Sequence, residues 1–237
     1  MHGNYGGRYY LKRTVLKDVC FLARRLLCLN INKMTFKKEI GEIYRLKVPF
    51  DTEVCTSVFL IKDEGGHILI DCATSAWDTD TYILPALGKM KIPVFSIKYL
   101  VLTHTHCDHA GGKERILQAN PKIKLVTDLR GNLQNGYTMY ALKGHTLDSV
   151  GVLDSHTHTL IAGDGLQCRG IGKYGCKFES EEEYIKTVKR LQEDKRVENI
   201  LFSHAYAPWQ KYGVFGREDV QKCLQDCMDY IKENNEK

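Results

Sequence analysis

The stretch LTHTHCDHAGG at residues 102–112 places three histidines and an aspartate within six residues, directly after the apolar run IKYLVL. Imidazole nitrogens and carboxylate oxygens are ligands that zinc and similar metals prefer. His104 and His106, separated by one residue, can reach one metal from a loop at the end of a strand. Asp108 and His109 follow too closely to join that metal easily, and they could serve a second one. Taken alone, the stretch also fits a polar turn after a buried strand.

A metal held by two histidines of one loop needs further ligands from other parts of the chain. The sequence supplies three candidates, each at the end of an apolar segment: His145 in ALKGH, Asp164 in TLIAGD and His204 in ILFSH. The ends of strands give site residues a rigid support. The pattern therefore favours a metal site that is built at strand ends from segments far apart in the sequence.

The elements that must position these residues follow from hydrophobic patterns and turn residues. Apolar runs predict strands, and longer amphipathic segments, one of them with a Ser cap and acidic first turn, predict helices. The predicted strands cover residues 42–50, 54–61, 67–72, 97–102, 121–128, 137–142, 149–154, 159–163 and 199–204, and the predicted helices cover residues 78–90, 111–120, 180–194 and 217–235. This alternation implies sheets that are covered by helices in layers.

Nine cysteines and a second H-x-H motif offer other candidate ligands. An odd number of cysteines without a C-x-x-C pair indicates reduced thiols rather than disulfides or a structural zinc site. Cys223 and Cys227 have helical spacing and are predicted to face the core. Cys107 stands between presumed ligands and is predicted to point away from the metal. His156 and His158 are predicted to lie in a hairpin turn and not to bind metal.

Composition and charge limit the classes of function. With 237 residues, 43% of them hydrophobic and 27% charged, the chain can bury the core of one domain. Residues 1–38 hold nine Lys and Arg side chains against one acid, so the net charge of +5 becomes −3 for residues 39–237. A mildly acidic body argues against nucleic-acid binding, and no apolar stretch approaches the roughly 20 residues of a membrane span. We expect a cytoplasmic protein that acts on a small-molecule substrate; the sequence indicates no oligomeric state.

The N-terminal segment differs from the rest of the chain. Residues 1–38 are interpreted as a basic extension and residues 39–237 as the functional domain. Apolar residues at helical spacing leave three interpretations: a helix over residues 11–30 on a membrane surface, a helix docked on the body, or a non-native start upstream of Met34. We favour the last, because a strand pattern begins directly after MTFKKE. Whether residues 1–33 belong to the natural protein does not follow from the sequence.

Over residues 40–235, the ordered set HTHCDHAGG, GH, GD and SH resembles the metallo-β-lactamase superfamily, with a ligand pattern like that of its lactonases and glyoxalase II enzymes. The resemblance implies an α+β fold, an αββα four-layer sandwich with a dinuclear centre at one edge of the two sheets. It implies two zinc ions, with iron or manganese as alternatives. Carried over residue by residue, the first metal is bound by His104, His106 and His145, the second by Asp108, His109 and His204, and Asp164 bridges the two.

Further residues acquire roles from the same resemblance. Asp71, in HILIDC, matches an aspartate that orients a ligand histidine. Asp108 has a catalytic role in addition to ligation, because it can orient the nucleophile and pass a proton to the leaving group. One departure from the family pattern is GHTLDS, in which Leu147 and Asp148 replace a Pro-Gly turn.

The glycine-rich segment 165–179 is a candidate part of the substrate pocket. Its residues Arg169, Lys173 and Tyr174 could meet a substrate, with a basic side chain facing a carboxylate or phosphate. The other interpretation of this segment is an ordinary surface loop.

These features predict a metal-dependent hydrolase of a small ester, lactone or thioester that uses a metal-bridging hydroxide as nucleophile. About 30 residues follow His204, which argues against the glyoxalase II type, because that type carries an additional helical domain for its glutathione thioester. One alternative is a redox member of the superfamily such as an iron-dependent persulfide dioxygenase, since similar ligands suit iron. The other is a metal-binding protein without catalysis.

Overall fold

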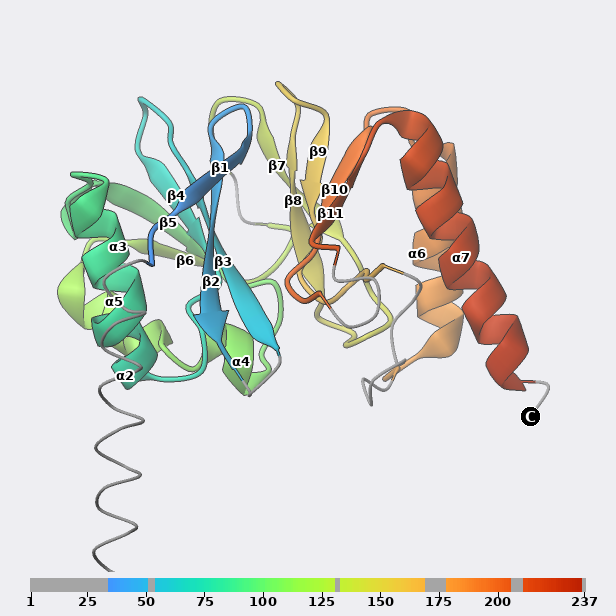
Figure 1. The fold of residues 1–237 in the computed structure, drawn as a ribbon, viewed down its shortest axis with the longest axis horizontal. Coiled ribbons are helices and arrows are strands. Elements are labelled where there is room, and N and C mark those ends of the chain that lie inside the picture. Colours follow the sequence, from blue (N-terminus) through green and yellow to red (C-terminus); the bar gives the residue numbers. More distant parts are fainter. Residues whose placement is uncertain (1–33, 51–53, 131–132, 169–177, 206–210, 236–237) are drawn as a thin grey trace, which may run out of the picture. The chain divides into compact units, whose positions relative to one another are not determined.

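Two β-sheets face each other at the centre of the fold (Figure 1). The computed structural model describes residues 34–50, 54–130, 133–168, 178–205 and 211–235. In these residues the first sheet has the strand order β1-β2-β3-β4-β5-β6. Its strands are β1 (Lys37–Ile40), β2 (Ile43–Pro49), β3 (Cys55–Ile61), β4 (His67–Ile70), β5 (Ile97–Val101) and β6 (Lys124–Val126).

The second sheet has the order β11-β10-β9-β8-β7. Its strands are β7 (Tyr137–Ala141), β8 (Val150–Asp154), β9 (Thr159–Ile161), β10 (Asn199–Leu201) and β11 (Gly213–Phe215). Strands β4, β5 and β6 run parallel in the first sheet, and β9 and β10 run parallel in the second. Parallel strands end at the same edge of a sheet, so the loops that follow them are brought together.

Helices cover both outer faces of the pair of sheets (Figure 1). On the side of the first sheet lie α2 (Ala76–Asp78), the π-helical turn Thr79–Ile83, α3 (Leu84–Lys89), the 3₁₀ turn Val94–Ser96 and α5 (Lys113–Ala119). On the side of the second sheet lie α6 (Glu181–Glu193) and α7 (Arg217–Asn235). The short α4 (Cys107–Ala110) lies at the lower edge of the sheets in Figure 1. The expected αββα arrangement of an α+β fold is confirmed.

Two apolar clusters hold these layers together. One lies between the sheets and includes Phe59, Val101 and Leu201, which are all fully buried. The other joins the second sheet to α6 and α7, and in it Cys223 and Cys227 pack on the core face of α7, as their spacing predicts. Burial of such side chains contributes roughly 1.5–3 kcal/mol for each large aliphatic or aromatic residue.

The helix expected at residues 78–90 is broken into α2, a π-helical turn and α3. Its start is nevertheless well defined, because the side chain of Ser75 accepts a hydrogen bond from the backbone N–H of Asp78. Strand β1 begins at Lys37, inside the range assigned to the N-terminal extension, and the interpretations of residues 1–33 lie outside the described residues. In the part of the chain that the structure describes, no helix is long and apolar enough to cross a membrane.

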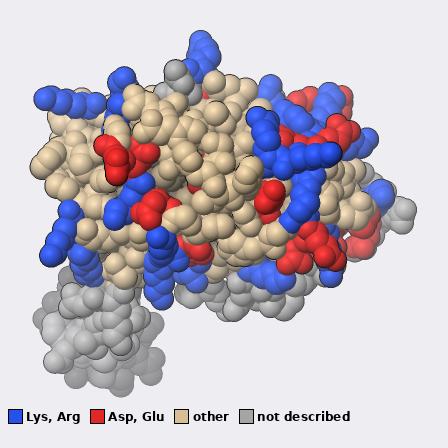
Figure 2. Space-filling view, turned by 90° about the horizontal axis from the view of Figure 1, so that it is seen from above, with Lys and Arg blue, Asp and Glu red and all other residues tan. Residues whose placement is uncertain are grey.

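Charged side chains on the face seen in Figure 2 are mixed in sign. Most of this face is formed by uncharged residues, and the charged side chains gather towards its edges, with Lys and Arg beside Asp and Glu on the right. Exposed pairs of this kind contribute little to stability, typically about 0.2–1 kcal/mol each.

Backbone hydrogen bonds join the two sheets at the edge where α4 lies. The N–H of Ser57 in β3 donates to the carbonyl of Ser203 after β10, at 2.8 Å. The N–H of Val150 in β8 donates to the carbonyl of Thr103 after β5, also at 2.8 Å. These bonds fix the relative position of the loops that carry the histidines of both sheets.

Candidate metal centre

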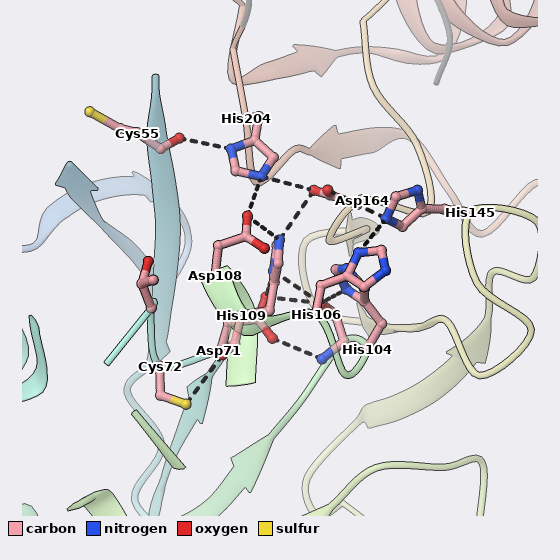
Figure 3. A network of polar contacts seen from close by, with 12 residues as sticks. Cys55, Asp71, Cys72, His104, His106, Asp108, His109, His145, Asp164 and His204 are labelled. Atoms are coloured by element: carbon pink, nitrogen blue, oxygen red, sulfur yellow. Dashed lines mark hydrogen bonds and ion pairs between the residues drawn. The ribbon is translucent and has the colours of Figure 1, made fainter. Parts of the chain in front are cut away.

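The seven predicted metal ligands converge on one small space between the ends of the two sheets (Figure 3). They come from the loop after β5, from α4, and from the loops that follow β7, β9 and β10. Their ligand atoms form three groups, each within 4.8 Å: His104 with His106 and His145, His104 with His109 and Asp164, and Asp108 with His109 and His204. Segments 100 residues apart in the sequence therefore supply one cluster of donors.

The first group consists of imidazoles alone. Nε2 of His145 lies 3.0 Å from Nδ1 of His106, and the ring of His104 stands edge-on to both of the other rings. His104 and His145 are buried, whereas His106 is exposed. Three imidazole nitrogens that face each other in this way can hold a metal and leave one position open towards solvent.

The second group combines imidazoles with a carboxylate. Oδ2 of Asp108 lies 3.1 Å from Nε2 of His204 and 3.4 Å from Nε2 of His109. Asp108 and His109 are consecutive residues of α4, and His204 is delivered by the opposite sheet. This group therefore closes only when the two sheets are packed together.

Asp164 lies between the two groups, and its two oxygens face different sides. Oδ1 lies 3.5 Å from Nε2 of His109 and 3.4 Å from Nε2 of His204, whereas Oδ2 lies 3.8 Å from Nε2 of His145. A carboxylate in this position can contribute one oxygen to each of two neighbouring metals.

The residues present fit a bound metal on two observations. Nε2 of His104, Nε2 of His109 and Oδ1 of Asp164 are buried and have no hydrogen-bond partner within the described residues, although such buried groups normally do. In addition, a tetrahedral zinc with Zn–N distances of about 2.0–2.1 Å places its ligand atoms about 3.3 Å apart. Six of the donor separations lie between 3.0 and 3.8 Å, and all donor atoms of one group lie within 4.8 Å of each other.

Acceptors behind three of the histidines fix their tautomers. His109 donates from Nδ1 to Oδ2 of Asp71 at 2.7 Å, and His204 donates from Nδ1 to the carbonyl of Cys55 at 3.0 Å. His104 donates from Nδ1 to Oγ1 of Thr103 at 3.2 Å. In each case Nδ1 is engaged with its acceptor, and Nε2 is the ring nitrogen that points into the centre.

Thr103 in turn is held by Asp71. Its backbone N–H donates to Oδ1 of Asp71 at 2.8 Å, and its hydroxyl donates to Oδ2 at 2.9 Å. Asp71 is fully buried and has a φ of 61°, a left-handed backbone conformation that is rare for residues other than glycine. Strain of this kind persists where surrounding contacts fix the residue, and here three hydrogen bonds to the carboxylate do so.

Burial keeps two members of the first group, His104 and His145, neutral. It lowers the pKa of His104 to about 2, with a further contribution from the nearby His109, and it lowers the pKa of His145 as well. Neutral imidazole is the form that binds metal.

The second group has the opposite electrostatics. Burial opposes the charged form of His109, but the carboxylates of Asp164 and Asp71 outweigh it and raise the pKa of His109 well above its ordinary value. His204 is raised in the same way to a pKa of about 9, despite its burial, by Asp164 and Asp108. The two histidines reciprocally hold the pKa of both carboxyl groups of the centre below their usual range against the effect of burial. Without metal, this side of the centre is a cluster of buried ion pairs.

Two glycines permit the close approach of the loops. A Cβ at Gly111, directly after α4, would overlap the carbonyl oxygen of Thr74. Gly163, which precedes Asp164, has a φ of +55°, and a Cβ there would lie 2.5 Å from Cβ of Thr103. These contacts press α4 and the loop after β9 against the centre.

Other candidates from the sequence lie elsewhere. Cys107 is exposed and belongs to none of the three groups. His156 lies in the turn after β8, where its Nε2 is 2.6 Å from the carbonyl of Asn135. The substrate residues suggested from the sequence, Arg169, Lys173 and Tyr174, lie outside the described residues. Thr103 and the carbonyl of Cys55 accept hydrogen bonds from ligand histidines, and neither role was predicted from the sequence. The position of Thr103 directly before His104 was the one available signal.

Comparison with known proteins agrees with this geometry. A family model described as the metallo-beta-lactamase superfamily matches residues 52–128. Hydroxyacylglutathione hydrolase 1 of Vibrio vulnificus is 27% identical over 165 residues, which cover 63% of this chain and 62% of the relative. Hydroxyacylglutathione hydrolase of Salmonella typhi is 30% identical over 130 residues, or 48% of each chain. This chain thus spans less than two thirds of the length of either relative.

Solved structures share the fold at low sequence identity. The metallo-beta-lactamase FIM-1 from Pseudomonas aeruginosa, in its mono-zinc form, superimposes with a TM-score of 0.64 at 17% identity, over 83% of this chain and 95% of that one. At 17% sequence identity, this similarity shows that the two proteins share a fold and does not show a shared activity. The chain thus has the fold of the metallo-beta-lactamase FIM-1, and over residues 52–128 its sequence matches the model of the metallo-beta-lactamase superfamily.

Proposed function

We propose that this protein is a metal-dependent hydrolase of a small ester, lactone or thioester, with two metal ions at its centre. The observation that carries the proposal is the position of Asp164, whose two oxygens face two separate groups of donors. The names of the two curated relatives support the inclusion of thioesters among the substrates. Zinc is the proposed metal because histidine and carboxylate donors suit it, and iron and manganese are the alternatives.

In this proposal each side of the centre holds one ion. His104, His106 and His145 bind the first, Asp108, His109 and His204 bind the second, and Asp164 contacts both. Two such ions would lower the pKa of a bound water and polarise the oxygen of the scissile bond. The protein contributes two neutral donors on the first side, His104 and His145. It also contributes the acceptors that hold the rings of His104, His109 and His204 in place.

Asp108 is proposed to orient the attacking water and to pass a proton to the leaving group. Its side chain is 12% exposed, more than that of Asp164 at 5% or Asp71 at 0%. It is therefore the carboxylate of the centre with the best access to a substrate.

The proposal is tested by metal analysis of the purified protein together with a panel of chromogenic esters, lactones and thioesters. We expect about two metal ions per chain and turnover of at least one of these classes. His106→Ala and Asp164→Ala should lose metal and activity together, because each removes a donor. His156→Ala, in the other H-x-H motif, is the matched control and should keep both. Loss of metal from Asp164→Ala without loss of the measured activity would contradict the mechanism.

A redox activity is the main alternative, because the same donors bind iron. Iron in the purified protein, together with oxygen consumption and no hydrolysis across the panel, would favour it. Normal metal content without turnover in either assay would instead favour a protein that binds metal without catalysis.

A further inference from the structure

A pocket of about 270 Å³ lies beside the loop that carries His145. Its walls come from residues 127–130, which follow β6, and from residues between 141 and 150, which connect β7 to β8. We call it the side pocket. Leu129 and Leu147 line it and are 52% and 47% exposed, respectively, which is high for large apolar side chains.

The side pocket adjoins the first group of histidines. Val150, on its wall, donates its backbone N–H to the carbonyl of Thr103, the residue before His104. His145 itself lies in the chain between two wall residues, Lys143 and Leu147. None of the seven proposed ligands lines the side pocket, so it neighbours the centre through the residues on either side of His145 and through Thr103.

The walls are held in place by hydrogen bonds. The backbone N–H of Leu147 donates to Oε2 of Glu179 at 2.6 Å, and the hydroxyls of Thr146 and Ser149 are 2.6 Å apart. A pocket that is formed in advance costs less ordering on binding. These bonds hold the wall formed by residues 146–149 in place.

The chemistry of the walls favours a hydrocarbon group. Leu129, Ala141, Leu147 and Val150 are apolar. The polar members are partly occupied already, since Arg130 donates from Nε to Asp128 at 3.0 Å, and Ser149 is bonded to Thr146. The charged wall residues Lys143 and Asp148 are exposed, and long charged side chains can keep their ends in water. An alkyl chain would cover the exposed leucine surface.

We propose that the side pocket binds the straight acyl chain of a medium-length ester or thioester. This inference rests on the hydrolase function proposed above and specifies its substrate. At roughly 30 Å³ for a group the size of a water molecule or a methylene, the volume suits a chain of roughly eight carbons.

The test uses p-nitrophenyl esters and matching thioesters with acyl chains from acetyl to dodecanoyl. In the wild type, kcat/KM should rise about 3- to 4-fold per methylene, as expected for burial of CH₂ groups, and level off near octanoyl. Leu129→Asp and Leu147→Asp should lower the octanoyl-to-acetyl ratio of kcat/KM at least tenfold. Leu129→Trp should move the optimum to shorter chains, a change that misfolding would not produce.

Leu125→Asp is the matched control, because Leu125 is 40% exposed on β6 but does not line the side pocket. It should keep the wild-type ratio. A flat chain-length series in an active enzyme would overturn the inference, as would an equal loss of the ratio in Leu125→Asp.

Calorimetry of octanamide binding to the metal-free protein separates the proposed hydrolase function from the proposed alkyl-binding pocket. If the protein hydrolyses none of the substrates, the hydrolase function is refuted. If octanamide still binds and Leu147→Asp weakens this binding, the side pocket is supported as an alkyl-binding site. An inactive protein that also fails to bind octanamide would refute both.

Discussion

His109 donates its Nδ1–H to Oδ2 of Asp71 across 2.7 Å, and both side chains are fully buried. Because the same carboxylate also accepts two hydrogen bonds from Thr103, it connects the orientation of His109 to that of the loop that begins with His104. A single residue after β4 thus acts on both sides of the centre.

Asp71→Asn should therefore weaken metal binding without removing a ligand. The amide has one acceptor oxygen and cannot accept from His109 and Thr103 as the carboxylate does. We expect a 10- to 100-fold loss of affinity, as for other residues that support a metal ligand, measured by competition with a chromogenic chelator. Asp154→Asn is the control. Asp154 is buried and accepts hydrogen bonds from His156 and Thr157 in the turn after β8, so its loss should lower stability but leave metal affinity unchanged.

Removal of metal should lower the melting temperature while the fold persists. In the absence of metal, His109 and His204 face the buried carboxylates of Asp108 and Asp164 and offset much of their negative charge. Metal at about 1,000 times its Kd adds about 4 kcal/mol, which corresponds to roughly 10 °C for a domain of this size. Calorimetry with and without a chelator measures the shift. His106→Ala should show a smaller shift, and a metal-independent melting temperature in the wild type would contradict the expectation.

Most strands and the set of converging residues could be predicted because their signals are local. An apolar run that ends in a small residue and a histidine or aspartate identifies both a strand and its end, as before Asp164. That these residues come together follows from the parallel pairs β4-β5 and β9-β10. Their roles as metal ligands stay predictions.

The features that were missed have weak or no local signals. Strand β1 has the charged sequence KKEI at the edge of a sheet, and β11 has only three residues. The break in the helix at Thr79–Ile83 comes just before Pro85, which has no backbone N–H to donate into the preceding turn. Hydrophobic spacing alone extended the helix through this position. The acceptor for His204 is the backbone carbonyl of Cys55, and a backbone group leaves no trace in residue type.

Gly111→Ala should test how tightly α4 is pressed against the loop after β4. The added methyl would overlap the carbonyl oxygens of Thr74 and Cys107, and neither backbone group can move without shifting Asp108 and His109. We expect a loss of about 1–3 kcal/mol, typical of overpacking, together with weaker metal binding. Gly88→Ala is the matched control. A Cβ at Gly88 in α3 would meet no atom within 4 Å, so this change should be neutral or stabilise by up to about 1 kcal/mol. Equal effects in urea denaturation would contradict the packing argument.

Asp194 should make stability fall at acid pH. Hydrogen bonds from Arg196, at 2.6 and 2.9 Å, hold the pKa of this carboxyl well below its ordinary value, and the hydroxyl of Tyr140 adds another at 3.0 Å. A carboxyl group whose pKa is lower in the folded state stabilises the protein above its unfolded pKa of about 4. This contribution is lost as the pH falls from there through the folded pKa.

Because the Arg196 side chain is 67% exposed and screened by solvent, we expect about 1 kcal/mol. In urea denaturation between about pH 5 and 2, Asp194→Asn should be less stable than the wild type at the upper end, and the difference should shrink towards the lower end. Asp219→Asn, at an exposed carboxylate that forms no ion pair within the described residues, should follow the wild-type curve. A constant difference between Asp194→Asn and the wild type across this window would show that the carboxyl group stabilises the turn after α6 through packing rather than through charge.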